Sequence, residues 1–193
     1  MANPFIDAAR TLLESLDAPI ARELTNAARD NSLVAAGVEL TIEEAIGLAL
    51  VAKHIAATDG LSAAESTGMR ALLSHYRVPL AAQEELLAID LSDATDDNVR
   101  ELVPAGSAKA MYLISGVAAI AARDGLSAEE VTQIEAIGAM IGLAKPMIDA
   151  LCAHAEAEVV ASIRNDRGML DKLDRLRDAL FRLADETDVA VAS

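Results

Sequence analysis

Residues 121–130 have the sequence AARDGLSAEE, and residues 56–65 have the similar sequence AATDGLSAAE. The two stretches lie 65 residues apart, and each follows an alanine-rich apolar run and precedes an amphipathic one. A stretch that recurs in the same context indicates a duplicated structural unit. We therefore expect two similar halves, each a helix-turn-helix, related by a pseudo-two-fold axis.

Both stretches carry the signals of a tight corner between two helices. The glycine in each copy follows an apolar helical run, where glycine adopts the left-handed conformation without a Cβ penalty. The serine and the glutamate at 62–65 and 127–130 then have the spacing of a capping box. In this motif the serine accepts from the N3 amide and the glutamate from the N-cap amide.

The composition predicts an all-α fold and limits the possible partners. Hydrophobic residues make up 53% of the chain, yet it has only two Phe, two Tyr and no Trp. An alanine-rich core favours helices that pack closely together. The formal net charge of −15 disfavours binding to nucleic acid or to anionic membranes and suits a cation or a basic partner. Solubility alone is the simplest explanation of that charge.

The sequence predicts a soluble cytoplasmic protein that is not an integral membrane protein. Cys152 is the single cysteine and cannot form an internal disulfide. The first residues read as a helix start rather than as a secretory signal. The longest run without charge, residues 110–122, is shorter than the roughly 20 residues that a membrane-spanning helix needs, so we expect a buried helix there.

Helix signals divide the chain into three parts. Residues 1–38 form an N-terminal helical arm, residues 41–160 form the main domain, and residues 168–186 form a C-terminal amphipathic helix. The main domain consists of the halves 41–90 and 96–160. The helix starts are marked by Asn3 before Pro4, by a third capping box at Thr41 and Glu44, and by Ser107.

The C-terminal helix carries a leucine-rich seam with two interpretations. Its apolar residues alternate at spacings of four and three, at Met169, Leu173, Leu176, Leu180 and Leu183. The helix could dock on its own domain through this seam. A homodimer through the same seam is the alternative, since heptad spacing is typical of coiled coils.

Residues of about 41–160 resemble the TerB-like domain family of tellurite-resistance proteins. The second half carries the resemblance, with IAARDGLSAEE at 120–130 and Ile-Gly-Leu at 141–143. Both copies here lack one residue that the family usually has after Asp-Gly. The resemblance implies a helical bundle of two similar halves. It also implies a stress-response module, and some members are attached to membrane-associated complexes.

The resemblance also implies a role for acidic residues in binding metal or facing partners. Carried over to this chain, they are Asp59, Glu65, Asp124, Glu129 and Glu130. Oxygen ligands of this kind suit Ca²⁺ or Mg²⁺. The simpler interpretation is structural, because the glutamates complete capping boxes and the aspartates close helices.

The chain shows no spacing typical of a catalytic or zinc site. His54, His75 and His154 have no histidine or cysteine four residues away, and Cys152 does not share a helix face with His154. We therefore predict a non-enzymatic stress-response module that binds a protein partner and binds divalent cations weakly at the two corners. Two alternatives stay open, a structural homo-oligomer assembled through the C-terminal helix and a metal-assisted enzyme.

Overall fold

The computed structural model describes residues 3–29, 38–56, 63–75, 78–123 and 125–191, and within the helices it leaves out the side chains at 56, 64, 65, 72, 75 and 183–191. These residues form ten helices and no strand, which confirms the all-α class. The helices are α1 (Pro4–Ser15), α2 (Ala18–Arg29), α4 (Ile42–Ala56), α5 (Ala63–His75), α6 (Leu80–Ala88), α7 (Asp96–Leu102), α8 (Ala108–Ala121), α9 (Ala128–Met140), α10 (Lys145–Ile163) and α11 (Arg167–Val191).

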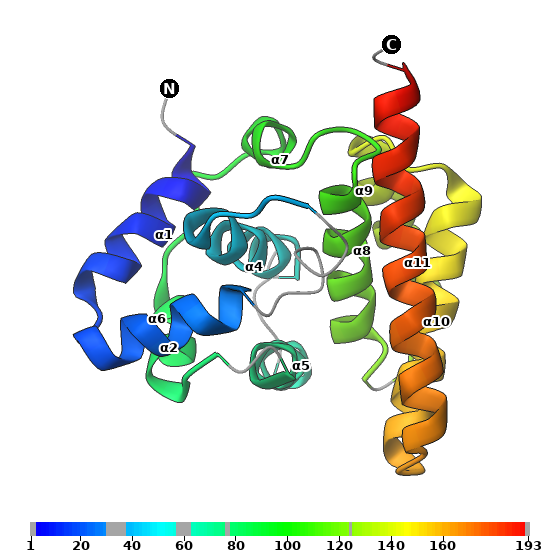
Figure 1. The fold of residues 1–193 in the computed structure, drawn as a ribbon, viewed down its shortest axis with the longest axis horizontal. Coiled ribbons are helices and arrows are strands. Elements are labelled where there is room, and N and C mark those ends of the chain that lie inside the picture. Colours follow the sequence, from blue (N-terminus) through cyan, green and yellow to red (C-terminus); the bar gives the residue numbers. More distant parts are fainter. Residues whose placement is uncertain (1–2, 30–37, 57–62, 76–77, 124, 192–193) are drawn as a thin grey trace.

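Helix α8 lies at the centre of the molecule (Figure 1). It contains the charge-free run predicted to be buried, and Ile114 and Ala118 are fully buried. Helices α4 and α5 pack on one side of α8, and α9, α10 and α11 pack against it as well. In the part of the chain that the structure describes, no helix combines the length and the apolar character needed to cross a bilayer.

The first two helices pack onto the first half of the main domain. Helix α1 contacts α4 and α6, and α2 contacts the same two helices. Phe5, Leu12 and Leu24 belong to the same apolar core as the side chains of α4 and α8. Burial of a side chain of this size contributes about 1.5–3 kcal/mol. The N-terminal segment therefore covers apolar surface that α4 would otherwise expose.

Predicted caps on the described residues are present. The side-chain oxygen of each capping residue accepts from an amide of the first helical turn, as seen for Asn3, Thr41, Ser107 and Ser127. The capping box predicted at 62–65 lies outside the described residues. Asp166 is an additional cap, because its Oδ1 accepts from the amide of Met169 at 3.0 Å. This cap starts α11 at Arg167, one residue before the predicted start at residue 168.

The second corner has the predicted geometry. Gly125 has a φ of +97°, a conformation that favours glycine, and its amide donates to the carbonyl of Ala122 at 3.2 Å. Leu126 then packs against the apolar core. The capping box of Ser127 and Glu130 starts α9 directly afterwards. The described residues of this stretch, 121–123 and 125–130, therefore place the start of α9 shortly after the end of α8.

Helix α11 docks on its own domain. It packs against α8 and α10, and its buried side chains include Leu173 and Phe181. Met169 and Leu176 of the predicted seam are instead 43% and 50% exposed. The seam therefore divides between an inner and an outer face of the helix. A homodimer through the outer face stays a prediction.

Candidate functional site

The five predicted metal-binding residues are only partly described. Asp59 and Asp124 lie outside the described residues, and so does the side chain of Glu65. Glu129 is exposed in the first turn of α9. Glu130 completes the capping box, since its Oε2 accepts from the amide of Ser127 at 2.7 Å.

The described part of this corner does not fit a metal site on its own. Glu130 already uses an oxygen to cap α9. Among the residues that the structure describes, no group of three or more His, Cys, Asp or Glu side chains could hold a metal ion. A divalent cation needs several oxygen ligands. The cation site therefore stays a prediction, and it depends on Asp59, Glu65 and Asp124, which the structure does not describe in full.

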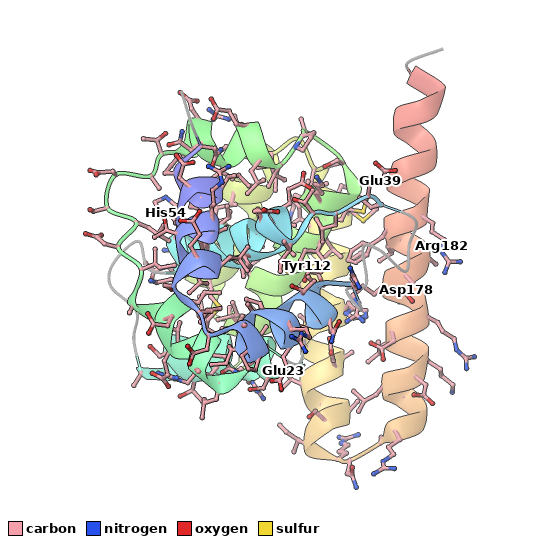
Figure 2. All side chains as sticks on the ribbon, turned by 60° about the vertical axis from the view of Figure 1, so that its left-hand side comes forward. Glu23, Glu39, His54, Tyr112, Asp178 and Arg182 are labelled. Carbon is pink, nitrogen blue, oxygen red and sulfur yellow. The ribbon has the colours of Figure 1, made fainter. Side chains whose placement is uncertain are left out.

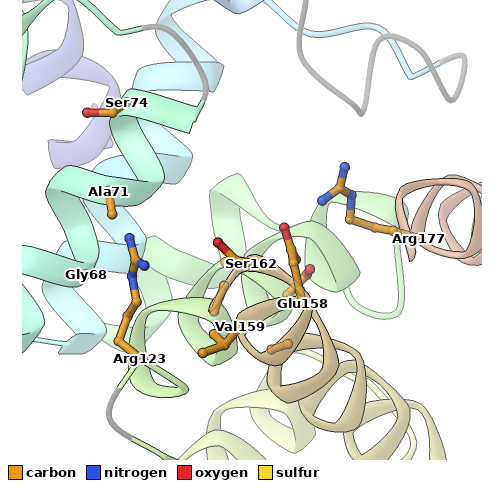
Figure 3. Close-up of a pocket in the computed structure, with 12 residues that line it drawn as sticks. Gly68, Ala71, Ser74, Arg123, Glu158, Val159, Ser162 and Arg177 are labelled. Atoms are coloured by element: carbon orange, nitrogen blue, oxygen red, sulfur yellow. The ribbon is translucent and has the colours of Figure 1, made fainter. Parts of the chain in front are cut away.

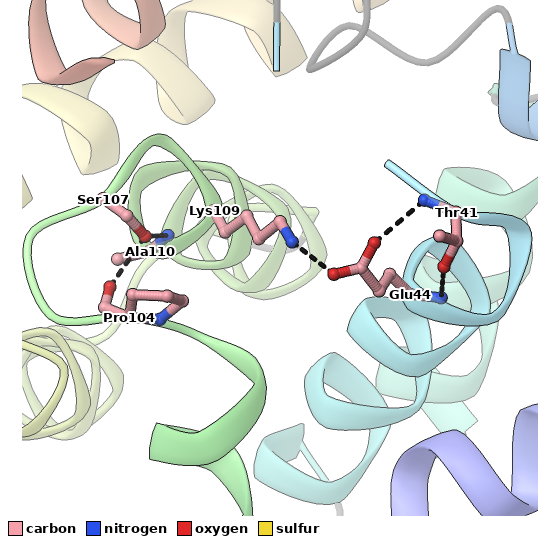
Figure 4. Close-up of polar contacts among 6 residues, drawn as sticks. All are labelled: Thr41, Glu44, Pro104, Ser107, Lys109 and Ala110. Atoms are coloured by element: carbon pink, nitrogen blue, oxygen red, sulfur yellow. Dashed lines mark hydrogen bonds and ion pairs between the residues drawn. The ribbon is translucent and has the colours of Figure 1, made fainter. Parts of the chain in front are cut away.

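A polar link joins the two central helices (Figure 4). Lys109 of α8 donates to Oε1 of Glu44 at 2.5 Å, and Oε2 of Glu44 accepts from the amide of Thr41 at 2.9 Å. Burial alone would raise the pKa of Glu44, but the hydrogen bonds from Lys109 and Thr41 outweigh it and lower this pKa. Glu44 thus caps α4 and ties it to α8.

Lys53 of α4 is a buried cation whose ammonium group binds the C-terminal end of α6. Its Nζ donates to the carbonyls of Leu87 and Ile89, at 2.8 and 2.5 Å, and the residue is only 6% exposed. These carbonyls belong to the C-terminal end of α6, where backbone acceptors lack helical partners. Burial lowers the pKa of Lys53, and the nearby Asp90 raises it in part. This arrangement makes Lys53 a structural residue.

A cavity of about 360 Å³ lies between α5, α8, α10 and α11. Its volume is in the range typical of small-molecule sites. Much of its wall consists of residues with little or no side chain, including Gly68, Ala71, Gly116, Ala119 and Ala155. These small residues leave space between helices that larger side chains would fill.

Among the described residues, three charged side chains line this cavity, and they come from three different segments. Arg123 follows α8, Glu158 lies on α10, and Arg177 lies on α11. Figure 3 shows the two arginines entering from opposite sides, with Glu158 and Ser162 between them in this view. The cavity therefore combines two guanidinium groups, one carboxylate and hydroxyl groups.

Arg177 is the most unusual of these side chains because it is only 8% exposed. One of its terminal nitrogens donates to Oδ1 of Asp174 at 2.8 Å, and Asp174 is half-exposed. Burying a guanidinium costs desolvation energy that only good partners offset. A buried arginine at the wall of a cavity is therefore a candidate binding group.

His154 connects α10 to α11. Its Nε2 lies 2.9 Å from the carbonyl of Leu173, so Nε2 carries the proton and donates it. Its Nδ1 lies 3.9 Å from Oε2 of Glu158, and among the described residues it has no hydrogen-bond partner. Cys152 is also buried, and burial raises the pKa of its thiol. Both residues lie within the helix packing.

The charged residues of the cavity were not among the predicted site residues. Arg177 had a detectable signal, since it lies four residues after Leu173 and four before Phe181 and therefore on the buried stripe of α11. Arg123 lies within the AARDGLSAEE corner but did not match any ligand pattern. No protein-family model matches the chain, and neither a curated protein nor a solved structure is significantly similar to it.

Proposed function

We propose that the chain is a non-enzymatic, cytoplasmic stress-response module of the TerB-like type that binds a protein partner. The proposed contact is the hairpin surface, which we define as Val160, Ile163, Met169 and Leu176 on α10 and α11. These four large apolar side chains are between 43% and 79% exposed. This exposure is the observation that carries the proposal, since large apolar side chains exposed on two adjacent helices are typical of interaction sites.

The charges around the hairpin surface indicate the chemistry of the partner. Residues 164–182 contain five exposed Arg or Lys and four Asp, whereas the whole chain has 16 basic and 31 acidic residues. Figure 2 shows Arg182 projecting outward from α11. An amphipathic helix with acidic flanks would bury its apolar face on the hairpin and pair its carboxylates with these arginines. We therefore propose such a helix as the partner.

The link between α4 and α8 supports the two-half TerB-like arrangement within this proposal. Glu44 and Lys109 are 65 residues apart, the same separation as the two Asp-Gly corners. Equivalent residues of two repeats meet each other when they lie close to a two-fold axis. A direct contact between such a pair is therefore what a pseudo-two-fold bundle would produce.

Site-specific photo-crosslinking tests the hairpin surface. A photoreactive amino acid at position 176 should crosslink an acidic amphipathic helix in stressed cells. The same probe at Leu80, a 68% exposed leucine on α6, serves as the matched control. The additional substitution Met169→Glu should abolish the crosslink from position 176. A crosslink of equal yield from both positions, or one unaffected by Met169→Glu, would contradict the proposal.

Sedimentation distinguishes the homo-oligomer from a partner complex. The proposal predicts that the chain alone is a monomer and that Leu176→Glu leaves it unchanged. A dimer that Leu176→Glu dissociates would establish assembly through the outer face of α11 instead.

Thermal unfolding with Ca²⁺, Mg²⁺ and Mn²⁺ tests the cation site separately. A rise in melting temperature that Asp124→Asn and Glu130→Gln remove would support it, because a ligand of the native state stabilises that state.

A further inference from the structure

The charges of the cavity between α5, α8, α10 and α11 define the ligand it could accept. Arg123 and Arg177 contribute two positive charges, and Glu158 contributes one negative charge. The described lining of the cavity is thus net positive inside a chain of net charge −15. Low-dielectric walls concentrate such a field within a cleft. A ligand with two acidic groups and one basic group would match this charge set.

The placement of the three groups agrees with that charge pattern. Arg123 and Arg177 enter the cavity from opposite sides, while Glu158 lies between them in the view of Figure 3. Guanidinium groups match carboxylates in geometry and pair with them through two hydrogen bonds. The carboxylate of Glu158 suits an ammonium group. Ser162 of α10 adds a hydroxyl group at the same wall.

The buried position of Arg177 is a second argument for a built site. The residue is 8% exposed, and one of its terminal nitrogens donates to Asp174 of the same helix. A leucine would continue the apolar stripe between Leu173 and Phe181 at lower desolvation cost. The guanidinium of Arg177 instead brings a positive charge to a cavity wall that consists largely of small residues.

We propose that this cavity binds a small amino dicarboxylate of the acidic amino-acid type, with one carboxylate at Arg123, the other at Arg177 and the ammonium group at Glu158. The small residues of the wall provide room for the ligand's carbon chain. This site is distinct from the hairpin surface, so binding of the small molecule can be measured on the isolated chain without any partner.

Calorimetric titration of the full chain with four compounds tests the proposal. L-Glutamate and L-aspartate carry all three groups, glutarate lacks the amine, and L-glutamine lacks the second carboxylate. Each is titrated up to about 10 mM, since weak small-molecule sites have Kd values near the millimolar range. We expect glutamate or aspartate to bind about tenfold or more tightly than glutarate and glutamine, because each comparison removes one charge-assisted contact.

Two variants assign the contacts. Arg123→Gln should weaken amino-acid binding by about tenfold or more, because it removes one charged hydrogen-bonding group. Glu158→Gln should abolish the preference for glutamate over glutarate. Arg123 is exposed and Glu158 is partly exposed, so neither substitution removes core packing. Arg182→Gln is the matched control, since it removes the same charge from an exposed site on α11 outside the cavity.

Three results would overturn the proposal. They are the absence of binding by both amino acids at about 10 mM, equal binding of glutamate and glutarate by the unmodified chain, and binding that neither Arg123→Gln nor Glu158→Gln changes. Circular dichroism of each variant verifies that the helices are retained. A failure of the crosslinking at the hairpin surface would leave these titrations unaffected, so the two proposals fail separately.

Discussion

The contact between Gly142 and the segment before α8 gives the sharpest prediction about stability. Gly142 follows α9 and has a φ of +78°. A Cβ built at this position would lie 2.8 Å from Cβ of Ala105 and 3.0 Å from the backbone nitrogen of Gly106. The amide of Gly106 also donates to the carbonyl of Ile141 at 2.9 Å. The two chain segments are therefore in contact through their backbones.

Gly142→Ala should destabilise the protein by two effects. An alanine in the left-handed conformation costs about 1–2 kcal/mol. The overlap with Cβ of Ala105 and the backbone nitrogen of Gly106 adds about 1–3 kcal/mol, the usual cost of overpacking. A total of about 2–5 kcal/mol is a large part of the 5–15 kcal/mol that stabilises a typical domain.

Gly106→Ala is the matched control. Gly106 has a φ of +73°, but a Cβ there would meet its nearest atom, the carbonyl oxygen of Gly142, at an ordinary 3.6 Å. This variant should therefore show the conformational cost alone, about 1–2 kcal/mol. Urea unfolding followed by circular dichroism measures both variants. If the two variants lost the same stability within about 0.5 kcal/mol, the usual limit for resolving independent effects, the inferred close contact would be refuted.

Three further predictions concern polar and nucleophilic groups. Glu44→Gln should lower the free energy of unfolding at neutral pH by about 1–3 kcal/mol. The pKa of Glu44 is lower in the folded than in the unfolded protein, so its contribution to stability is present above the unfolded pKa and is lost as the pH falls through the folded pKa. The unfolding curves of variant and wild type should therefore converge in acid. Ser127→Ala should cost about 0.5–2 kcal/mol in urea unfolding, as expected for a lost N-cap; no loss would contradict the capping role. Cys152 should react with iodoacetamide at neutral pH far more slowly than it does in the unfolded chain, because burial raises its pKa and blocks access; equal rates would contradict its buried position.

The features that the sequence predicted well depend on residues close together in the chain. A capping box involves residues three positions apart, so the pattern at Ser127 and Glu130 was sufficient to start α9 at the correct place. The buried helix α8 was equally evident, because its run of apolar residues carries no charge. The helix start at Asp166 was missed although it is an ordinary cap of the same local kind.

The features that the sequence could not predict depend on contacts between distant segments. In the sequence, Lys53 is a charge near the end of a helix, and only the tertiary fold places its ammonium group on the carbonyls of Leu87 and Ile89. The cavity likewise requires four segments to meet, so no local pattern joins Arg123 to Arg177. The sequence alone therefore could not predict that Lys53 and Arg177, among the basic residues, are buried.

These buried cations change how the acidity of the chain should be understood. Lys53 and Arg177 are 6% and 8% exposed, and the side chain of Lys109 is 16% exposed. Each of these cations donates hydrogen bonds to oxygen atoms of the chain, which offsets part of its desolvation cost. Positive charge is thus withdrawn from the surface, while most carboxylates stay in water. An anionic ligand is repelled by this surface and attracted only where an arginine is accessible, and that condition favours the cavity and the arginine-rich hairpin over the rest of the molecule.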